Sequence, residues 1–328
     1  MTTREPASAH ATPSARNPGQ PLDLSWVHSL RVNRLAVERR AATLPARRTV
    51  KKQWQAAWLL RSVTLMDLTA LSGDDTPGTI RRLCAKARRP VEDEWLEKLG
   101  MAGRPIRAGA VCVYPALAPA AQEALRGSGI PVAAVAGGFP AGQIALPAKL
   151  EEIRQLVDSG VEEIDAVISR AHVLRQDWEA LYDEIAAFRH ACGPAHLKVI
   201  LATGELGRLR SVAIASRVAM MAGADFIKTS TGKEPINATL PVGLIMTRAI
   251  REYAEMTGYR VGFKPAGGIR TAKQAIDWMI LVKEELGTDW LTPSLFRLGA
   301  SALLTDVERQ LVHAATGRYS AVHRHPMP

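Results

Sequence analysis

The chain has 328 residues, of which 47% are hydrophobic and 23% charged, and its formal net charge is +10. This composition excludes a wholly disordered chain, and the length suits either two average domains or one large α/β barrel. Three cysteines cannot form an even set of disulfides, and no apolar run is long enough to cross a bilayer. We therefore expect a cytoplasmic protein with no membrane contact.

The positive charge is concentrated at the N-terminus. Residues 1–53 hold 10 Lys/Arg and 3 Asp/Glu, whereas the remaining 275 residues hold 32 and 29. A basic arm of this kind is compatible with an RNA-binding or scaffold protein, whose affinity would fall with salt. No nucleic-acid motif surrounds the arm, however, and the i, i+4 spacing of Trp54 and Trp58 is typical of a packed helix face. We therefore expect no nucleic-acid partner.

The first 60 residues predict short elements ahead of the main domain. Residues 1–20 lack the apolar core of a secretion signal and are expected to form a disordered leader. Residues 21–60 are expected to form a helical extension, with one helix over 24–42 and another over 54–62. The main domain is therefore expected to begin at residue 61.

Eight short apolar runs follow, each rich in β-branched residues. They are SVTLMDL, AVCVYP, PVAAVAGG, EEIDAVI, KVILATG, DFIKTST, VGFKPAGG and FRLGAS. Nearly continuous apolar runs are typical of parallel strands that are buried on both faces. Segments with helical periodicity separate them, and one of these has a capping box at Thr271 and ends at Gly287.

This alternation predicts a (β/α)8 TIM barrel over residues 61–312, with a C-terminal tail over 313–328. A doubly wound open sheet is the alternative fold, because periodicity cannot show that a sheet closes. No GxGxxG motif follows the first predicted strand, which counts against a dinucleotide-binding sheet.

Four charged residues interrupt or end the apolar runs: Asp67, Asp165, Lys228 and Lys264. Active sites of such barrels lie at the carboxyl ends of the strands, so these positions are candidates for catalysis. Lys228 and Lys264 fall on consecutive predicted strands, which lie about 4.8 Å apart. Repulsion between the two lysines and burial are both expected to lower a lysine pKa from about 10.4 toward neutrality.

A neutral lysine amine can attack a carbonyl and form an imine, which lets a neighbouring C–C bond break. Asp165 can keep the second lysine charged and relay protons. The alternative is that Asp165 and Lys264 form an inert buried ion pair.

Glycine-rich loops follow the last two predicted strands, at PAGGIR and GAS. In barrels these loops commonly hold a phosphate, which makes Gly267, Gly268, Gly299 and Ser301 candidate contacts. The histidines show no metal-ligand spacing, so we expect no metal site. Cys112, inside a predicted strand, is expected to be a small core residue.

The runs MDLTALSGDDT, VCVYPA, EEIDAVI, KVILATGEL, GADFIKTSTGK, VGFKPAGGIRT and FRLGASALL resemble deoxyribose-phosphate aldolase in this order. The resemblance covers the chain from Leu22 to its C-terminus and is closest to the longer, animal-type branch. It implies a metal-free class I aldolase without a cofactor, which acts in deoxyribonucleoside catabolism. Such an enzyme reversibly cleaves 2-deoxy-D-ribose 5-phosphate to acetaldehyde and D-glyceraldehyde 3-phosphate.

The resemblance also implies roles for individual residues. It places the Schiff-base lysine at Lys228, its partner at Lys264 and the proton-relay aspartate at Asp165. A proton-shuttle tyrosine that some members have falls on Tyr319. The implied substrate contacts are Asp67, Thr69, Gly232, Lys233, Gly267, Gly268, Gly299 and Ser301.

Two departures from the family pattern bear on the substrate. Many members have a second hydroxyl residue where Ala302 stands, and a bulkier residue where Ala166 stands. Substrate preference is therefore expected to differ in degree. A Schiff-base aldolase that acts on a different phosphorylated sugar would use the same lysine chemistry and is the alternative enzyme. Small phosphorylated sugars and aldehydes are the expected partners, and a homo-oligomer is compatible with the resemblance.

Overall fold

The computed structural model describes residues 16–47, 50–51 and 53–327. Residues 1–15 of the predicted leader lie outside the described residues, as do residues 48–49 and 52 of the basic segment. Asn17 is the first buried residue of the described chain, with 1% of its surface exposed. Among the helices that the structure describes, none has the length and apolar character that a membrane span needs.

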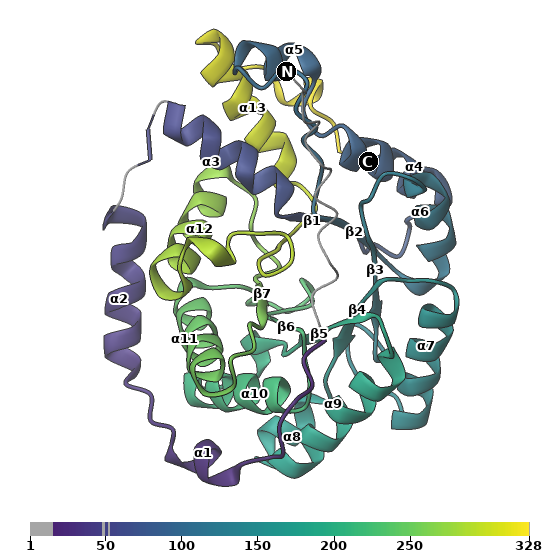
Figure 1. The fold of residues 1–328 in the computed structure, drawn as a ribbon, viewed down its shortest axis with the longest axis vertical. Coiled ribbons are helices and arrows are strands. Elements are labelled where there is room, and N and C mark those ends of the chain that lie inside the picture. Colours follow the sequence, from purple (N-terminus) through teal and green to yellow (C-terminus); the bar gives the residue numbers. More distant parts are fainter. Residues whose placement is uncertain (1–15, 48–49, 52, 328) are drawn as a thin grey trace, which may run out of the picture.

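Eight parallel strands form the centre of the molecule (Figure 1). They are β1 (Met66–Ala70), β2 (Ala110–Val113), β3 (Val132–Ala136), β4 (Glu163–Val167), β5 (His196–Ile200), β6 (Phe226–Lys228), β7 (Gly262–Lys264) and β8 (Leu298–Ala300). Each overlaps one of the eight predicted apolar runs, although β1 ends two residues after its run and β5 begins two residues before its run. The hydrogen-bonded order is β7-β6-β5-β4-β3-β2-β1-β8, so each strand pairs with its neighbours in sequence and β1 pairs with β8.

Two isolated parallel bridges join the ends of this sheet. Phe263 pairs with Phe296, and Ala266 pairs with Gly299, so the chain around β7 meets the chain around β8. The sheet therefore closes on itself. The predicted (β/α)8 barrel is confirmed, and the open-sheet alternative is wrong.

Helices surround the barrel and alternate with the strands. They are α4 (Pro77–Arg88), α5 (Asp93–Lys98), α6 (Ala118–Leu125), α7 (Leu146–Asp158), α8 (Arg170–Leu174), α9 (Trp178–Cys192), α10 (Leu209–Met221), α11 (Leu240–Thr257), α12 (Ala272–Leu286) and α13 (Leu303–Thr316), with short 3-10 turns at 115–117, 203–205, 288–290 and 322–324. The predicted capping box is present at the start of α12, where Thr271 and Gln274 bond each other's backbone N–H groups, and Gly287 ends the helix.

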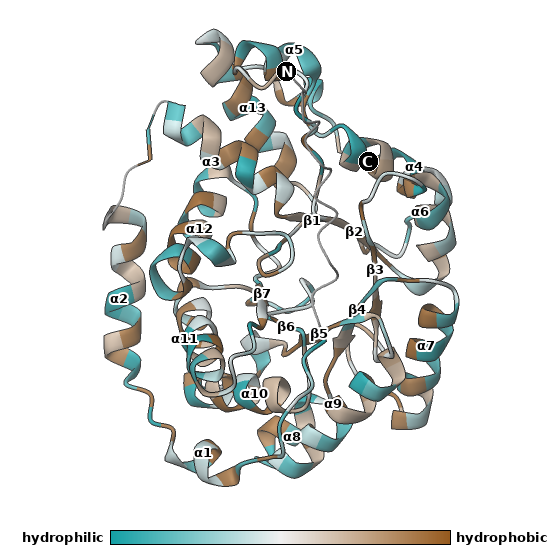
Figure 2. Ribbon diagram, viewed as in Figure 1, coloured by the Kyte–Doolittle hydropathy of each residue, from teal (hydrophilic) through white to brown (hydrophobic). Residues whose placement is uncertain are grey.

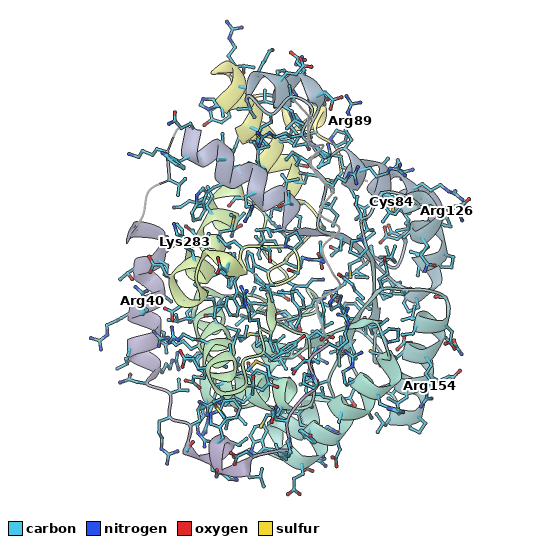
Figure 3. All side chains as sticks on the ribbon, in the orientation of Figure 1. Arg40, Cys84, Arg89, Arg126, Arg154 and Lys283 are labelled. Atoms are coloured by element: carbon cyan, nitrogen blue, oxygen red, sulfur yellow. The ribbon has the colours of Figure 1, made fainter. Side chains whose placement is uncertain are left out.

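Ahead of the barrel, the described residues form three helices: α1 (Leu24–Ser29), α2 (Arg34–Arg47) and α3 (Gln53–Thr64). The single helix predicted over 24–42 is wrong, because the chain becomes extended at Leu30 (φ −60°, ψ 130°). A new helix starts after Asn33, whose Oδ1 accepts a hydrogen bond from the Ala36 N–H at 3.0 Å. In Figure 1, α2 runs along the outside of α11 and α12. Arg40, labelled in Figure 3, lies on α2. It forms a 2.7 Å ion pair with Glu284 of α12.

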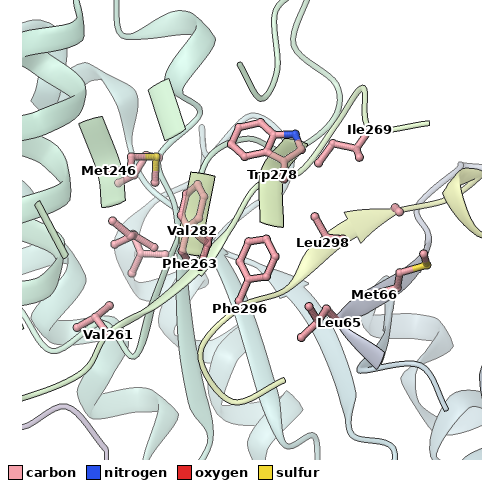
Figure 4. Close-up of a cluster of buried hydrophobic side chains, with 14 of the residues drawn as sticks. Leu65, Met66, Met246, Val261, Phe263, Ile269, Trp278, Val282, Phe296 and Leu298 are labelled. Carbon is pink, nitrogen blue, oxygen red and sulfur yellow. The ribbon is translucent and has the colours of Figure 1, made fainter. Parts of the chain in front are cut away.

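The main hydrophobic core lies between the barrel wall and the helices. Phe263 of β7 packs against Phe296 and Trp278, with ring centroids 6.2 and 6.0 Å away (Figure 4). Hydrophobic and hydrophilic residues alternate around outer helices such as α2 and α7 (Figure 2). This pattern is the amphipathic one expected of helices that cover a sheet.

The prediction for the two tryptophans of α3 is half right. Trp58 packs against the core, and the Lys283 Nζ lies 5.5 Å from its ring centroid. Trp54 is instead 67% exposed. It lies in the first turn of α3, ahead of Ala56, the first buried residue of that helix.

Candidate active site

The interior of the barrel holds seven charged side chains, each at most 4% exposed. They are Asp67, Glu163, Asp165, Lys198, Lys228, Lys264 and Arg297. They come from five strands and from the residue that precedes β8, so the barrel itself fixes their positions. Buried charges are stable only when they are paired, and these residues pair with one another.

Asp165 lies at the centre of the predicted trio. Its Oδ2 accepts hydrogen bonds from the Lys228 Nζ and the Lys264 Nζ, each at 2.7 Å. The strand register places Lys228 directly beside Lys264. The structure therefore brings together the two lysines and the aspartate that the sequence singled out.

The other oxygen of Asp165 bonds a third lysine. Lys198, its register partner on β5, donates to Asp165 Oδ1 at 2.9 Å and to Glu163 Oε2 at 2.6 Å. The Asp165 carboxylate thus faces three ammonium groups. Three donors fix both its position and its orientation.

Asp67 and Arg297 complete the buried network on the far side of Lys264. Asp67 Oδ2 lies 2.5 Å from the Lys264 Nζ, and its Oδ1 accepts a 2.5 Å hydrogen bond from Arg297. Arg297 also donates to Glu163 Oε1 at 2.8 Å. Both Asp67 oxygens are therefore engaged by cations beneath the pocket.

Burial alone would raise the pKa of both aspartates. For Asp165 the charges of Lys198, Lys228 and Lys264 outweigh burial, and they hold its pKa well below the ordinary value. For Asp67 the charges of Arg297 and Lys264 likewise lower the pKa. Both carboxyl groups are therefore ionised at neutral pH.

Lys264 differs from the expectation of a lowered lysine pKa. Burial alone would lower its pKa, but the charges of Asp165 and Asp67 outweigh burial and raise it. The prediction from the sequence considered only burial and the repulsion between two neighbouring lysines. The sequence does not show that Asp67 and Asp165, from two other strands, both contact Lys264. Lys264 is therefore a stable ammonium group.

A pocket of about 310 Å³ opens above this network at the carboxyl ends of the strands, and Lys228 is part of its lining. Seven predicted substrate contacts also line it: Thr69, Gly232, Lys233, Gly267, Gly268, Gly299 and Ser301. Asp67 is fully buried and is absent from the lining. The pocket thus has a lysine at its base and glycine-rich loops around it.

Two glycines of the pocket occupy positions that a larger residue could not. A Cβ on Gly267 would lie 2.6 Å from the Asn237 Cγ, and the residue has a φ of +83°. A Cβ on Gly299 would lie 2.8 Å from that of Ala266. The close approach of these loops therefore depends on glycine.

Comparisons with known proteins agree with this geometry. Residues 61–308 match the family described as DeoC/LacD family aldolase. The chain is 60% identical to deoxyribose-phosphate aldolase of Homo sapiens over 96% of its own length and 99% of that protein. It is 60% identical to the Mus musculus protein of the same name over 94% and 98%. The chain belongs to the DeoC/LacD aldolase family.

A solved structure shares the fold of this aldolase at much lower identity. It is the tetrameric deoxyribose phosphate aldolase from Aeropyrum pernix, with a TM-score of 0.56 and 22% identity. The match covers 85% of this chain and 99% of that one. At this identity the likeness concerns the fold alone.

The predicted shuttle Tyr319 lies away from the pocket of the aldolase. It is 62% exposed, and its ring stacks on His313 with centroids 4.1 Å apart. Another residue of the tail, Met327, lines the pocket instead. His325 anchors this end of the tail, because its backbone carbonyl accepts a 2.8 Å hydrogen bond from Thr305.

Cys112 is a core residue, as expected. It is fully buried inside the barrel beside Ala133 and Val135. Burial raises the pKa of its thiol to about 11. A thiol of this pKa is protonated at neutral pH.

Sequence reasoning missed three members of the buried network: Glu163, Lys198 and Arg297. Each is a charged residue within or next to an apolar run, which is the same signal that singled out Asp165. Glu163 is the first residue of β4 and lies deeper in the barrel than the carboxyl ends of the strands, whereas Lys198 lies level with Asp165 in the middle of β5. The pocket residues Ser72, Asp75 and Arg270 lie on loops and gave no comparable signal.

Proposed function

We propose that this aldolase reversibly cleaves 2-deoxy-D-ribose 5-phosphate to acetaldehyde and D-glyceraldehyde 3-phosphate through an imine on Lys228. The observation that carries the proposal is the position of Lys228. Its amine bonds Asp165 at 2.7 Å, and it lines a pocket whose other walls are glycine-rich loops. The names of the human and mouse relatives support this choice of substrate.

The first step joins the lysine to the sugar. The neutral Lys228 amine attacks the C1 aldehyde of the open-chain sugar and forms a carbinolamine. Loss of water from the carbinolamine gives a protonated imine, which attracts electrons from the C2–C3 bond. This step requires a proton donor for the departing oxygen.

Asp165 and Lys264 are our candidates for proton transfer. Both reach the Lys228 amine, because Asp165 Oδ2 accepts hydrogen bonds from both lysines. Lys264 is a stable ammonium group that can donate a proton to the carbinolamine oxygen through Asp165. The Lys264 amine that results then takes up the C3 hydroxyl proton through Asp165, and the C2–C3 bond breaks.

Bond cleavage releases D-glyceraldehyde 3-phosphate and leaves the two-carbon fragment on Lys228 as an enamine. Lys264 returns this proton to C2 of the enamine, which gives the imine of acetaldehyde. Water then hydrolyses this imine and regenerates the free amine. The same steps in reverse join the two aldehydes.

The phosphate is proposed to bind at the loops after β7 and β8. The Gly232 N–H already donates to Glu234 at 3.1 Å, and the Gly299 N–H to the Pro265 carbonyl at 2.9 Å. These two glycines therefore shape the pocket, which leaves Gly267, Gly268 and Ser301 as candidate backbone contacts. Lys233 and Arg270, both exposed at the pocket, add positive charge. Thr69 is proposed to face the sugar.

We further propose a cytoplasmic enzyme that acts on small phosphorylated sugars and aldehydes, without a nucleic-acid partner. The three cysteines are all buried as free thiols, which suits a reducing compartment. The predicted homo-oligomer stays a prediction, which the molecular mass in solution tests.

A substrate panel tests the proposal. The purified protein is given 2-deoxyribose 5-phosphate or ribose 5-phosphate, and acetaldehyde is measured with a coupled reductase. We expect acetaldehyde from the deoxy sugar alone, and none above background from a Lys228→Met variant. A Lys283→Met variant, altered on the outer helix α12, should keep normal turnover. Normal turnover by Lys228→Met would contradict the assignment.

A further inference from the structure

The buried charges of the barrel form a closed ring of alternating sign. Starting from Asp165, the ring runs through Lys198, Glu163, Arg297, Asp67 and Lys264 and returns to Asp165. Every link is an ion pair between 2.5 and 2.9 Å. Each member therefore contacts two residues of opposite charge.

The ring is balanced without the proposed nucleophile. It contains three carboxylates and three cations, so its formal charge is zero. Lys228 is attached from outside, through the Asp165 oxygen that Lys264 also uses. Within the described chain, Lys228 is thus the seventh and surplus charge of the network.

This charge balance makes loss of a proton more costly for Lys264 than for its neighbour Lys228. Lys264 has Asp67 on one side and Asp165 on the other, at 2.5 and 2.7 Å. Loss of its proton would leave the buried Asp67 carboxylate with Arg297 as its one cationic neighbour in the ring, which is costly at low dielectric. Loss of the Lys228 proton leaves every carboxylate of the ring with two cationic neighbours.

We propose that Glu163, Lys198 and Arg297 are positioning residues that complete the charge balance and thereby make Lys228 the amine that reaches the substrate uncharged. This inference rests on the proposed function. None of the three lines the pocket, so they act through Asp165 and Asp67 and not on the sugar.

The charged and titratable groups around Lys228 come from four other strands of the barrel. They are Asp165 on β4, Lys198 on β5, Lys264 on β7 and the Cys112 thiol on β2. Asp75, Lys233 and Arg270 lie at the pocket mouth. A substitution at Glu163 or Lys198 changes the charge of the buried ring and leaves the residues that line the pocket unchanged.

The test measures how imine formation depends on pH. Full-length protein is incubated with 2-deoxyribose 5-phosphate across a pH series, and the imine is trapped with cyanoborohydride and quantified on the Lys228 peptide. Lys198→Met leaves one carboxylate in excess, so Lys228 should hold its proton more strongly. We expect the midpoint of the pH profile to rise by about one unit, which lowers trapping at neutral pH about tenfold.

Glu163→Gln should have the opposite effect, because it leaves one cation in excess. Its midpoint should fall by a similar amount. The double variant restores a balanced ring of two carboxylates and two cations, so its midpoint should return toward that of the wild type. Lys198→Arg keeps the charge and should leave the midpoint in place.

A merely structural role predicts another pattern. It would lower trapping in both single variants with no shift of the midpoint and would make the double variant worse, and this result would overturn the inference. If Lys198→Met does not fold, the nearly isosteric Glu163→Gln carries the test, and an unmoved midpoint there is equally contradictory. Absence of a wild-type imine on Lys228 would instead reject the proposed function.

Discussion

At the scale of single residues, Asp165 determines what the lysines around it can do. It accepts hydrogen bonds from Lys198, Lys228 and Lys264 and is fully buried. Its charge stabilises the cations at the base of the pocket, and its Oδ2 joins the proposed nucleophile to the proposed proton donor. One carboxylate therefore has both a structural and a chemical function.

Removal of the Asp165 charge should damage catalysis strongly. Asp165→Asn keeps the shape of the side chain but cannot relay a proton, so we expect kcat to fall about 10²- to 10⁴-fold. The coupled acetaldehyde assay measures this loss. Asp158→Asn, an exposed change at the end of α7, is the control and should retain the wild-type kcat. Equal activity of the two variants would exclude a role for Asp165.

Asp67 should contribute mainly to stability. Asp67→Asn leaves Arg297 and Lys264 short of a buried partner, which should lower the free energy of unfolding by about 3–5 kcal/mol. Urea unfolding at pH 7 measures this change. A loss below about 1 kcal/mol would mean that the ion pairs of Asp67 are dispensable.

The same groups predict how stability depends on pH. The pKa values of Asp67 and Asp165 are lowered in the folded protein, so their contribution is complete above about pH 4 and is lost as the pH falls. The pKa of Lys264 is raised, so its contribution is complete below about pH 10 and is lost as the pH rises further. Urea unfolding across pH should show a plateau between these limits. In Asp67→Asn, the acid-side decline should be smaller than in the wild type.

At the scale of elements, the loops after β7 and β8 form the proposed phosphate end of the pocket. Gly267→Ala forces a Cβ against Asn237 at a positive φ, so the loop must shift. We expect KM for the phosphorylated sugar to rise at least about tenfold. Gly287→Ala is the matched control, because this glycine also has a positive φ (+95°), but a Cβ there would meet no atom within 4 Å, and it lies at the far end of α12. Similar KM values for both variants would contradict the assignment of this loop.

The eight strands could be predicted from the sequence because each is an almost continuous apolar run bounded by turn residues. Helix boundaries in the extension were less accessible. No Pro or Gly marks the break between α1 and α2 at Leu30 in the sequence. The start of α2 is apparent only in the structure, where Asn33 accepts a hydrogen bond from the Ala36 N–H. Trp54 has the spacing of a buried residue, but the helix meets its neighbours only from Ala56 onward.

The residues of the site that could be predicted are those that stand out in their own stretch of sequence. A charged residue that interrupts or ends an apolar run identified Asp165, Lys228 and Lys264. The partners of these residues come from other strands, so the ring and the raised pKa of Lys264 depend on barrel closure. The exposed position of Tyr319 depends in turn on how the tail packs.

At the scale of the whole molecule, the N-terminal segment is attached to the barrel by buried polar contacts. The Asn17 side chain donates to the Met220 and Ala224 carbonyls at 2.8 and 2.9 Å, and its Oδ1 accepts from the Tyr253 hydroxyl at 3.0 Å. Asn17 does not line the pocket. It contacts helices α10 and α11 on the outside of the barrel. The part of the segment that the structure describes, from residue 16 on, therefore stabilises the fold without lining the pocket.

Loss of this anchor should affect stability and spare catalysis. Asn17→Ala leaves buried partners unsatisfied, and we expect the free energy of unfolding to fall by about 2–3 kcal/mol with kcat unchanged. Gln20→Ala, at an exposed position, should have no effect on either quantity. Urea unfolding and the acetaldehyde assay test both expectations. A loss of kcat in folded Asn17→Ala would show that the segment influences the pocket.

The central claim is that Lys228 forms an imine with the two-carbon product of sugar cleavage. Its most direct test is borohydride reduction of the protein during turnover of 2-deoxyribose 5-phosphate, in excess chelator, followed by peptide mass mapping. The account predicts an ethyl group on Lys228 and none on Lys264 or Lys198. An ethyl group on either of those lysines, or no adduct on folded protein, would contradict it.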